Sequence, residues 1–217
     1  MLTTILFDVD GTLIDTEYAV VTSFRQALHE VIGVDPPAGE LDFILGIPGS
    51  AAVDRYADSA AAAERLDASW AAHSARLQRT QRLFDQISTT LTALRRDGFA
   101  LGIVTSRTDA EMTGDLRHFG LDDTFDVVVT SSDTIRHKPD PDPVLHALHV
   151  VDVRPDQALY VGDSVYDMQC ANAAGVEFVV AGWGARDLTV FTRAAAVIAS
   201  PPDLIGFVER HTSDAGS

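Results

Sequence analysis

The chain has 217 residues, enough for one core domain with a small insertion, and 46% of them are hydrophobic. Its formal net charge is −16, and a chain this acidic repels a phosphate backbone, so a nucleic-acid polymer is a poor candidate partner. The single cysteine, Cys170, forms no intrachain disulfide, and no apolar run approaches the ~18 residues that span a bilayer. The first residues carry no basic, apolar leader. These features predict a cytoplasmic protein with no membrane partner.

Short apolar runs rich in β-formers recur along the chain, and each ends in a polar or glycine-containing turn. They cover residues 4–7, 100–104, 126–130, 158–161 and 177–181. Helical patterns separate the later runs, at residues 110–119, 143–149 and 168–174. Strands that are almost continuously apolar and alternate with helices are typical of a parallel sheet covered on both faces. The sequence therefore predicts an α/β fold built on a parallel sheet.

One interval breaks this alternation of strands and helices. Roughly 80 residues of helical character separate the first two runs, far more than a βα connection needs. Residues 19–31 and 59–81 have the composition of helices. We therefore predict a small all-helical cap domain at 17–82, inserted into a core formed by 1–16 and 83–217.

Two aspartates, Asp8 and Asp10, directly follow the first predicted strand. Because side chains alternate along a strand, carboxylates two residues apart point to the same side. Ligands of open parallel sheets bind beyond the carboxyl ends of the strands, where this pair lies. Gly11 permits a tight turn and Thr12 adds a hydroxyl. The alternative is an ordinary Asp-Gly turn, but an apolar strand that runs into alternating aspartates favours a site that binds a cation.

Two further polar residues stand after or between later strands. Thr105 ends the second run, and its hydroxyl beside backbone N–H groups could bind a phosphoryl oxygen or simply cap a helix. Lys138 precedes Pro139, which restrains the backbone, and a lysine there could meet a phosphate or stay solvated. Each feature is weak alone, but both belong to the predicted carboxyl edge of the sheet.

A second acidic pair follows the fourth run. Asp163 ends this predicted strand, and Asp167 lies one helical turn further on, where it could support the same site. Carboxylate oxygens of this kind suit Mg²⁺, which commonly takes one or two carboxylates together with water and phosphate oxygens. The alternative is that these aspartates cap a helix. The convergence of four polar clusters on one sheet edge favours a magnesium site.

These motifs resemble those of the haloacid dehalogenase-like (HAD) hydrolase superfamily. The segment from Asp8 to Asp15 is similar to the first motif, Thr105 to the second, Lys138 to the third, and Asp163 with Asp167 to the fourth. The resemblance covers nearly the whole chain. It implies a Rossmann-like core with the helical cap of the phosphoglycolate phosphatase and β-phosphoglucomutase branch.

The resemblance also implies a reaction. Asp8 would attack phosphorus to form an aspartyl-phosphate, and Asp10 would protonate the leaving oxygen and then activate water. Mg²⁺ would be held by Asp8, the backbone carbonyl of Asp10 and Asp163, with Asp167 in support. Thr105 and Lys138 would neutralise the transferring phosphoryl group.

The remaining expected residues are substrate contacts, namely Gly11, Thr12, Ser106 and Arg107. The expected substrate is a small phosphorylated metabolite such as phosphoglycolate, a sugar phosphate or a nucleotide. The expected assembly is a monomer or homodimer.

Differences from the family pattern narrow the reaction. Dehalogenases lack the second aspartate, so Asp10 argues for phosphoryl transfer. β-Phosphoglucomutases carry a histidine about ten residues after it, where this chain has Val20, and basic residues in the cap loop, where residues 45–49 have none. A phosphatase is therefore favoured. The alternatives are an inorganic pyrophosphatase, a β-phosphoglucomutase-like phosphotransferase and a non-enzymatic binding module.

Overall fold

The computed structural model describes residues 1–37, 39–46 and 49–214. The strands are β1 (Thr4–Phe7), β2 (Ile14–Asp15), β3 (Arg82–Leu83), β4 (Ala100–Val104), β5 (Val127–Val129), β6 (Ala158–Gly162), β7 (Glu177–Ala181) and β8 (Ala196–Ile198). The α-helices are α1 (Glu17–Ile32), α2 (Gly49–Asp54), α3 (Ala60–Leu77), α4 (Ile87–Arg96), α5 (Asp109–Phe119), α6 (Asp142–Val150), α7 (Val165–Ala173) and α8 (Asp203–Asp214).

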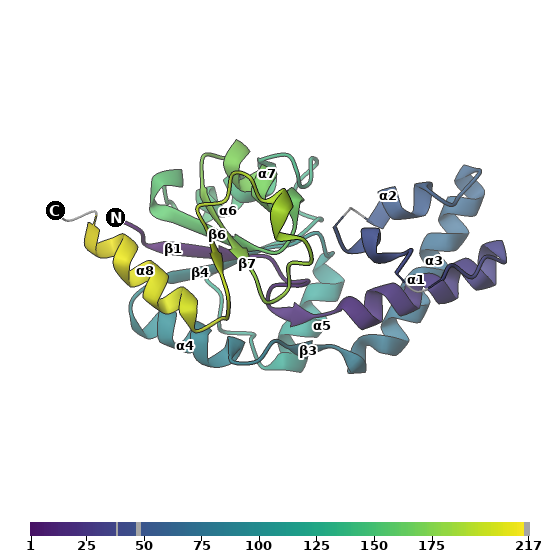
Figure 1. Cartoon of the computed structure of the whole chain (residues 1–217), viewed down its shortest axis with the longest axis horizontal. Helices are drawn as coiled ribbons and strands as arrows, with labels where there is room; N and C mark the ends of the chain where they lie inside the picture. The colour runs from purple at the N-terminus through teal and green to yellow at the C-terminus, as the bar shows by residue number, and fades with distance from the viewer. Residues whose placement is uncertain (38, 47–48, 215–217) are drawn as a thin grey trace. The chain divides into compact units, whose positions relative to one another are not determined.

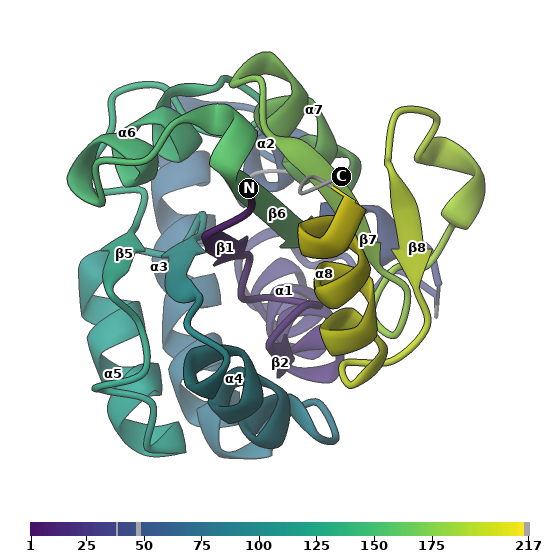
Figure 2. The same ribbon diagram turned by 90° about the vertical axis from the view of Figure 1, so that its left-hand side faces the viewer.

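Six strands form a parallel sheet in the order β5-β4-β1-β6-β7-β8 (Figures 1 and 2). The chain leaves the central strand β1, fills one side of the sheet through β4 and β5, and then returns to build the other side from β6 to β8. The predicted α/β fold with a Rossmann-like parallel sheet is confirmed. The short edge strand β8 is a strand that the periodicity did not indicate.

Helices cover both faces of this sheet, as Figure 2 shows for α4, α5 and α8 on one face and α6 and α7 on the other. Alternating strand residues divide between the two layers. Within β1, Ile5 and Phe7 pack with α4, α5 and α8, whereas Leu6 packs with α6 and α7. All three side chains are fully or almost fully buried, so β1 is fixed at the centre of the sheet.

The register of β1 decides which loops meet at the carboxyl edge. Phe7 is paired with Ile103 of β4 on one side and with Val161 of β6 on the other. The segments that follow these three strands therefore leave the sheet side by side. They begin at Asp8, at Thr105 and at Asp163, so the sheet brings three of the predicted motifs to adjacent positions.

The chain divides into two compact units, Met1–Ile14 with Leu83–Ser217, and Asp15–Arg82. The second unit has its own apolar core, in which α1 and α3 contribute Phe24, Leu28 and Leu66, all fully buried. Within it, the indole of Trp70 donates a 3.0 Å hydrogen bond to the buried hydroxyl of Ser23. Its role as a cap stays a prediction.

Part of the loop at residues 45–49, whose lack of basic residues disfavours a mutase, lies outside the described residues, namely Ile47 and Pro48. Among the described residues, no helix combines the length and the hydropathy that crossing a bilayer requires.

Candidate active site

Three carboxylates cluster at the carboxyl edge of the sheet. Asp8 follows β1, Asp163 follows β6, and Asp167 lies in the first turn of α7; each offers an oxygen, and these oxygens lie within 4.8 Å of one another. Asp167 is fully buried and Asp8 is 8% exposed. Ionised carboxylates at this spacing repel strongly in a buried site, so the cluster requires positive charge.

Lys138 supplies part of that charge. Its ammonium lies 2.8 Å from Asp8 Oδ1 and 2.7 Å from Asp167 Oδ1, and the lysine is itself buried. Burial alone would lower the pKa of Lys138, but Asp167 and Asp8 outweigh burial and raise it, so the ammonium stays charged. Lys138 therefore links Asp8, at the end of β1, to Asp167 of helix α7.

One lysine does not balance three carboxylates. Burial raises the pKa of Asp8 to about 7; Asp167 and Asp10 add to this shift, and Lys138 opposes it. Burial and the charges of Asp167 and Asp8 also raise the pKa of Asp163, against a hydrogen bond from Thr12. Hard carboxylate oxygens with an uncompensated negative charge suit Mg²⁺, so this donor set fits the metal that the sequence predicted.

Asp167 is held by the protein on both of its oxygens. Oδ1 meets Lys138 and lies 3.0 Å from the hydroxyl of Tyr160, while Oδ2 accepts from the backbone N–H and the hydroxyl of Ser164 at 3.0 and 2.7 Å. Ser164 caps α7 and accepts in turn from the Asp167 N–H. These contacts occupy both oxygens of Asp167, so its main role in this structure is to hold Lys138. Asp8 and Asp163 have fewer contacts with the protein and are the better candidates for metal ligands.

The turn after Asp10 is packed against Asp163. Gly11 has φ +73°, and a Cβ at this position would lie 2.0 Å from Asp163 Oδ2, so only glycine fits. The buried hydroxyl of Thr12 donates to Asp163 Oδ1 at 3.0 Å. In this structure Thr12 thus orients a metal-ligand candidate; a substrate contact by Gly11 or Thr12 stays a prediction.

The loop after β7, which includes Trp183 and Gly184, packs directly against the same turn. The indole N–H of Trp183 donates to the Thr12 carbonyl at 2.8 Å. A Cβ on Gly184 would lie 1.6 Å from the carbonyl oxygen of Gly11, so the two backbones are in direct contact. The loop therefore fixes the position of the strand-end aspartates indirectly, through the turn that follows them.

Thr105 is buried, and its hydroxyl accepts a 3.2 Å hydrogen bond from the Arg107 N–H. The helix α5 begins later and is capped at Thr108, whose N–H and hydroxyl both donate to Glu111. Thr105 is therefore not the cap of α5, which keeps its predicted phosphoryl contact open. Ser106 is exposed beside it.

Arg107 is placed differently from the expected substrate contact. Its guanidinium donates to both carboxylate oxygens of Asp10, at 2.8 and 2.6 Å, and also contacts the buried Asp115 of α5. The Asp10 side chain therefore meets Arg107, and Asp10 is not among the three clustered carboxylates. A substrate contact by Arg107 stays a prediction.

Three residues of this site lie outside the motifs that the sequence indicates. Tyr160 lies in an apolar strand, where a buried hydroxyl needs a partner, and that was the available signal. Trp183 between two glycines had an equally simple explanation as a packed aromatic. Asp115 occupies a helix that otherwise showed only an amphipathic pattern, and no local pattern reveals its partner.

The fold and the acidic cluster define an α/β protein with an enzyme-like centre at the carboxyl edge of its sheet. Comparison with known proteins refines this class. The family model described as haloacid dehalogenase-like hydrolase matches residues 5–181. The chain therefore belongs to this family, which confirms the resemblance seen in the sequence.

Individual relatives have different names. The tyrosine-protein kinase PtkA of Mycobacterium tuberculosis is 34% identical over 202 residues, which span 89% of this chain and 69% of the kinase. The pyrophosphatase PpaX of Bacillus cereus is 30% identical over 182 residues, 83% of each chain. A crystal structure from Lactobacillus plantarum, provisionally named a phosphoglycolate phosphatase, is similar with a TM-score of 0.87 and 29% identity, covering 95% of this chain and 99% of that one.

The contact between Gly184 and Gly11 predicts a sharp effect of a single methyl group. Gly184→Ala forces the two backbones apart and displaces the turn that holds Asp163, so we expect a lower melting temperature and weaker Mg²⁺ binding. Thermal unfolding with and without Mg²⁺ measures both. Gly206→Ala is the control, because its Cβ meets only the flexible end of Arg210. Equal behaviour of the two variants would contradict this role of the contact.

The raised pKa of Asp8 predicts that Mg²⁺ stabilises the protein most at alkaline pH. A folded pKa of about 7 lies above the unfolded value, so the stability contributed by the protonated group is lost as the pH rises through about 7. Mg²⁺ would bind the ionised cluster in place of that proton. The Mg²⁺-induced rise in melting temperature should be larger at about pH 8 than at about pH 5.5.

Two variants test whether this rise belongs to the cluster. Asp8→Asn should abolish most of it, and Asn in place of the exposed Asp122 should leave it intact. An equal rise at both pH values, or a full rise in Asp8→Asn, would show that the metal binds elsewhere.

Proposed function

We propose that this protein is a Mg²⁺-dependent phosphatase that hydrolyses small phosphomonoesters through Asp8. The observation that carries the proposal is the placement of Asp8: it is buried at the end of the central strand, bonded to Lys138, and clustered with Asp163 and Asp167. Nucleophile, fixed cation and metal-ligand candidates thus converge on one carboxylate. Membership of a hydrolase family supports the same reaction class.

The proposed reaction has two steps. An oxygen of Asp8 attacks phosphorus, the bond to the leaving oxygen breaks, and Asp10, which enters this step in its protonated form, donates its proton to that oxygen. Asp10 then takes a proton from water, which attacks the phosphorus of the aspartyl-phosphate and regenerates Asp8. Both carboxylates return to their starting states, and the products are the alcohol and inorganic phosphate.

The surrounding residues contribute orientation and charge. Lys138 holds Asp8 by one oxygen and keeps positive charge beside the transferring phosphoryl group. Thr105 is proposed to contact the same group. Asp8, the Asp10 carbonyl and Asp163 would hold Mg²⁺, with Asp167 in support through Lys138; when bound, the metal supplies charge that offsets the phosphoryl oxygens.

The substrate is proposed as a small phosphorylated metabolite of the phosphoglycolate, sugar phosphate or nucleotide type. Inorganic pyrophosphate is the second candidate, because the pyrophosphatase PpaX matches this chain over most of both lengths. The match to the tyrosine-protein kinase PtkA covers 69% of that protein. Among the described residues, no contact indicates a protein substrate, so protein phosphorylation is not proposed. A screen of phosphorylated metabolites together with pyrophosphate distinguishes these candidates.

Replacement of the nucleophile gives the most direct test. Asp8→Asn should lower hydrolysis of para-nitrophenyl phosphate by at least about 10³-fold, because an amide oxygen cannot form the phosphoenzyme. EDTA should have the same effect on the wild type, and added Mg²⁺ should restore the rate. Turnover that persists in Asp8→Asn, or in metal-free protein, would refute the proposal.

The acid–base role of Asp10 has a different signature. Asp10→Asn should lower kcat by about 10²-fold or more on alkyl phosphates while the circular dichroism spectrum stays that of the wild type. Steady-state kinetics on an alkyl phosphate found in the screen measures the effect. A normal kcat would remove Asp10 from proton transfer and leave Asp8 as the nucleophile.

A further inference from the structure

An ion-pair chain runs from the interior of the protein to the proposed acid–base residue. Arg107 contacts Asp115 through Nη1, and Asp10 through Nε and Nη2. Side-chain exposure rises along this chain, from 2% at Asp115 and 13% at Arg107 to 38% at Asp10. Only the Asp10 end is accessible to a small molecule, and the other end is fixed in the core.

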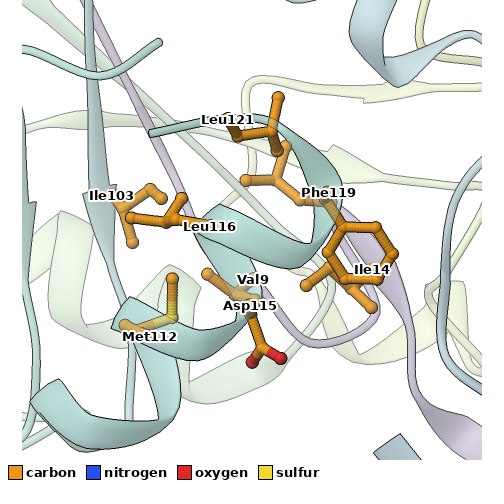
Figure 3. Close-up of a pocket in the computed structure, with 9 residues that line it drawn as sticks. Val9, Ile14, Ile103, Met112, Asp115, Leu116, Phe119 and Leu121 are labelled. Atoms are coloured by element: carbon orange, nitrogen blue, oxygen red, sulfur yellow. The ribbon is translucent and has the colours of Figure 1, made fainter. Parts of the chain in front are cut away.

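The inner end is anchored on the helix α5. Figure 3 shows Asp115 in the lining of a mostly apolar pocket that Leu116, Phe119 and Leu121 also line, with its carboxylate directed away from them. A carboxylate buried in such surroundings is costly unless it is paired. Its contact with Arg107 supplies that pair, so the apolar packing of α5 also fixes the guanidinium.

The backbone of Arg107 is held as firmly as its side chain. Its N–H donates to Thr105 Oγ1 at 3.2 Å, and its carbonyl accepts from the N–H and the hydroxyl of Ser131 at 2.8 and 3.2 Å. Ser131 follows β5 and Thr105 follows β4, so two neighbouring strand ends fix this position. The Arg107 guanidinium is thus held in one position by the protein and is not a mobile surface charge.

We propose that Arg107, anchored by Asp115, is a positioning residue that orients Asp10 for proton transfer to the leaving group. This inference rests on the proposed phosphatase function. A guanidinium that binds both oxygens of a carboxylate fixes the plane and the direction of that group. Asp10 lies between the end of β1 and the turn that begins at Gly11, and its side chain is the most exposed member of this ion-pair chain.

A substrate contact by Arg107 is the competing role, and kinetics separates the two. Loss of a substrate contact weakens binding and raises KM, whereas a misplaced Asp10 lowers kcat. A positioning role also depends on the leaving group. Proton donation matters most for alcohols, which are poor leaving groups, and least for para-nitrophenolate.

The experiment compares para-nitrophenyl phosphate with the alkyl phosphate that the wild type hydrolyses fastest. Arg107→Lys keeps the charge but cannot hold both carboxylates. We expect its kcat to fall by about 10²-fold on the alkyl phosphate and far less on the aryl phosphate, as in Asp10→Asn. In the Asp10→Asn background, Arg107→Lys should have no further effect, because Arg107 acts through Asp10.

Two further variants control for folding. The double variant Arg107→Gln with Asp115→Asn removes both charges of this pair together and should show the same dependence on the leaving group. Arg95→Lys is the matched control, because Arg95 forms a half-exposed pair with Asp126 at the opposite edge of the sheet and should leave both rates unchanged. Melting temperatures of all variants verify the fold.

The possible outcomes are distinct. Equal losses on both substrates, a change in KM alone, or additive effects in the Asp10→Asn background would overturn the positioning role while the phosphatase proposal stands. A wild type that hydrolyses no alkyl phosphate would overturn the phosphomonoesterase proposal and the positioning role with it.

Discussion

The buried contact of Lys138 with Asp8 and Asp167 holds the proposed active site together. None of these three groups could be charged in the interior alone, because desolvation of each costs several kcal/mol. The pairing is completed by Tyr160 and Ser164, which occupy the remaining capacity of Asp167. Both oxygens of Asp167 are therefore occupied by contacts with the protein, whereas Asp8, the proposed nucleophile, keeps one oxygen that Lys138 does not bind.

The sheet makes this contact possible, because β1 lies between β4 and β6. Glycines next to the site then leave space for the carboxylate side chains. A Cβ on Gly162, at the end of β6, would lie 2.7 Å from Asp167 Oδ2, so the absence of a side chain there gives Asp167 its place. Gly11 does the same for Asp163 on the neighbouring segment. Sheet topology sets the approximate location of the carboxylates, and glycine backbone sets their spacing.

The sequence could predict the parts that depend on local pattern and on sheet geometry. Asp8 and Asp163 each follow an apolar strand. Because the carboxyl ends of parallel strands lie along the same edge of a sheet, the sequence could predict that these two side chains lie close together. Contacts between side chains distant in the chain were not, because periodicity carries no information about rotamers or partners. Arg107 and Asp10 are 97 positions apart, and no local signal connects them. The edge strand β8 was missed because three residues are too few to show a pattern.

Two cations divide the proposed chemistry between adjacent aspartates. Asp8 and Asp10 are two residues apart at the same strand end, yet Asp8 is buried, Asp10 is partly exposed, and each meets a different partner. Lys138 bonds Asp8 by a single oxygen, as a point charge does, whereas Arg107 binds both oxygens of Asp10. A nucleophile needs one oxygen free to attack, and an acid–base group needs a fixed orientation. The difference between lysine and arginine geometry would therefore give two chemically identical side chains their different proposed roles.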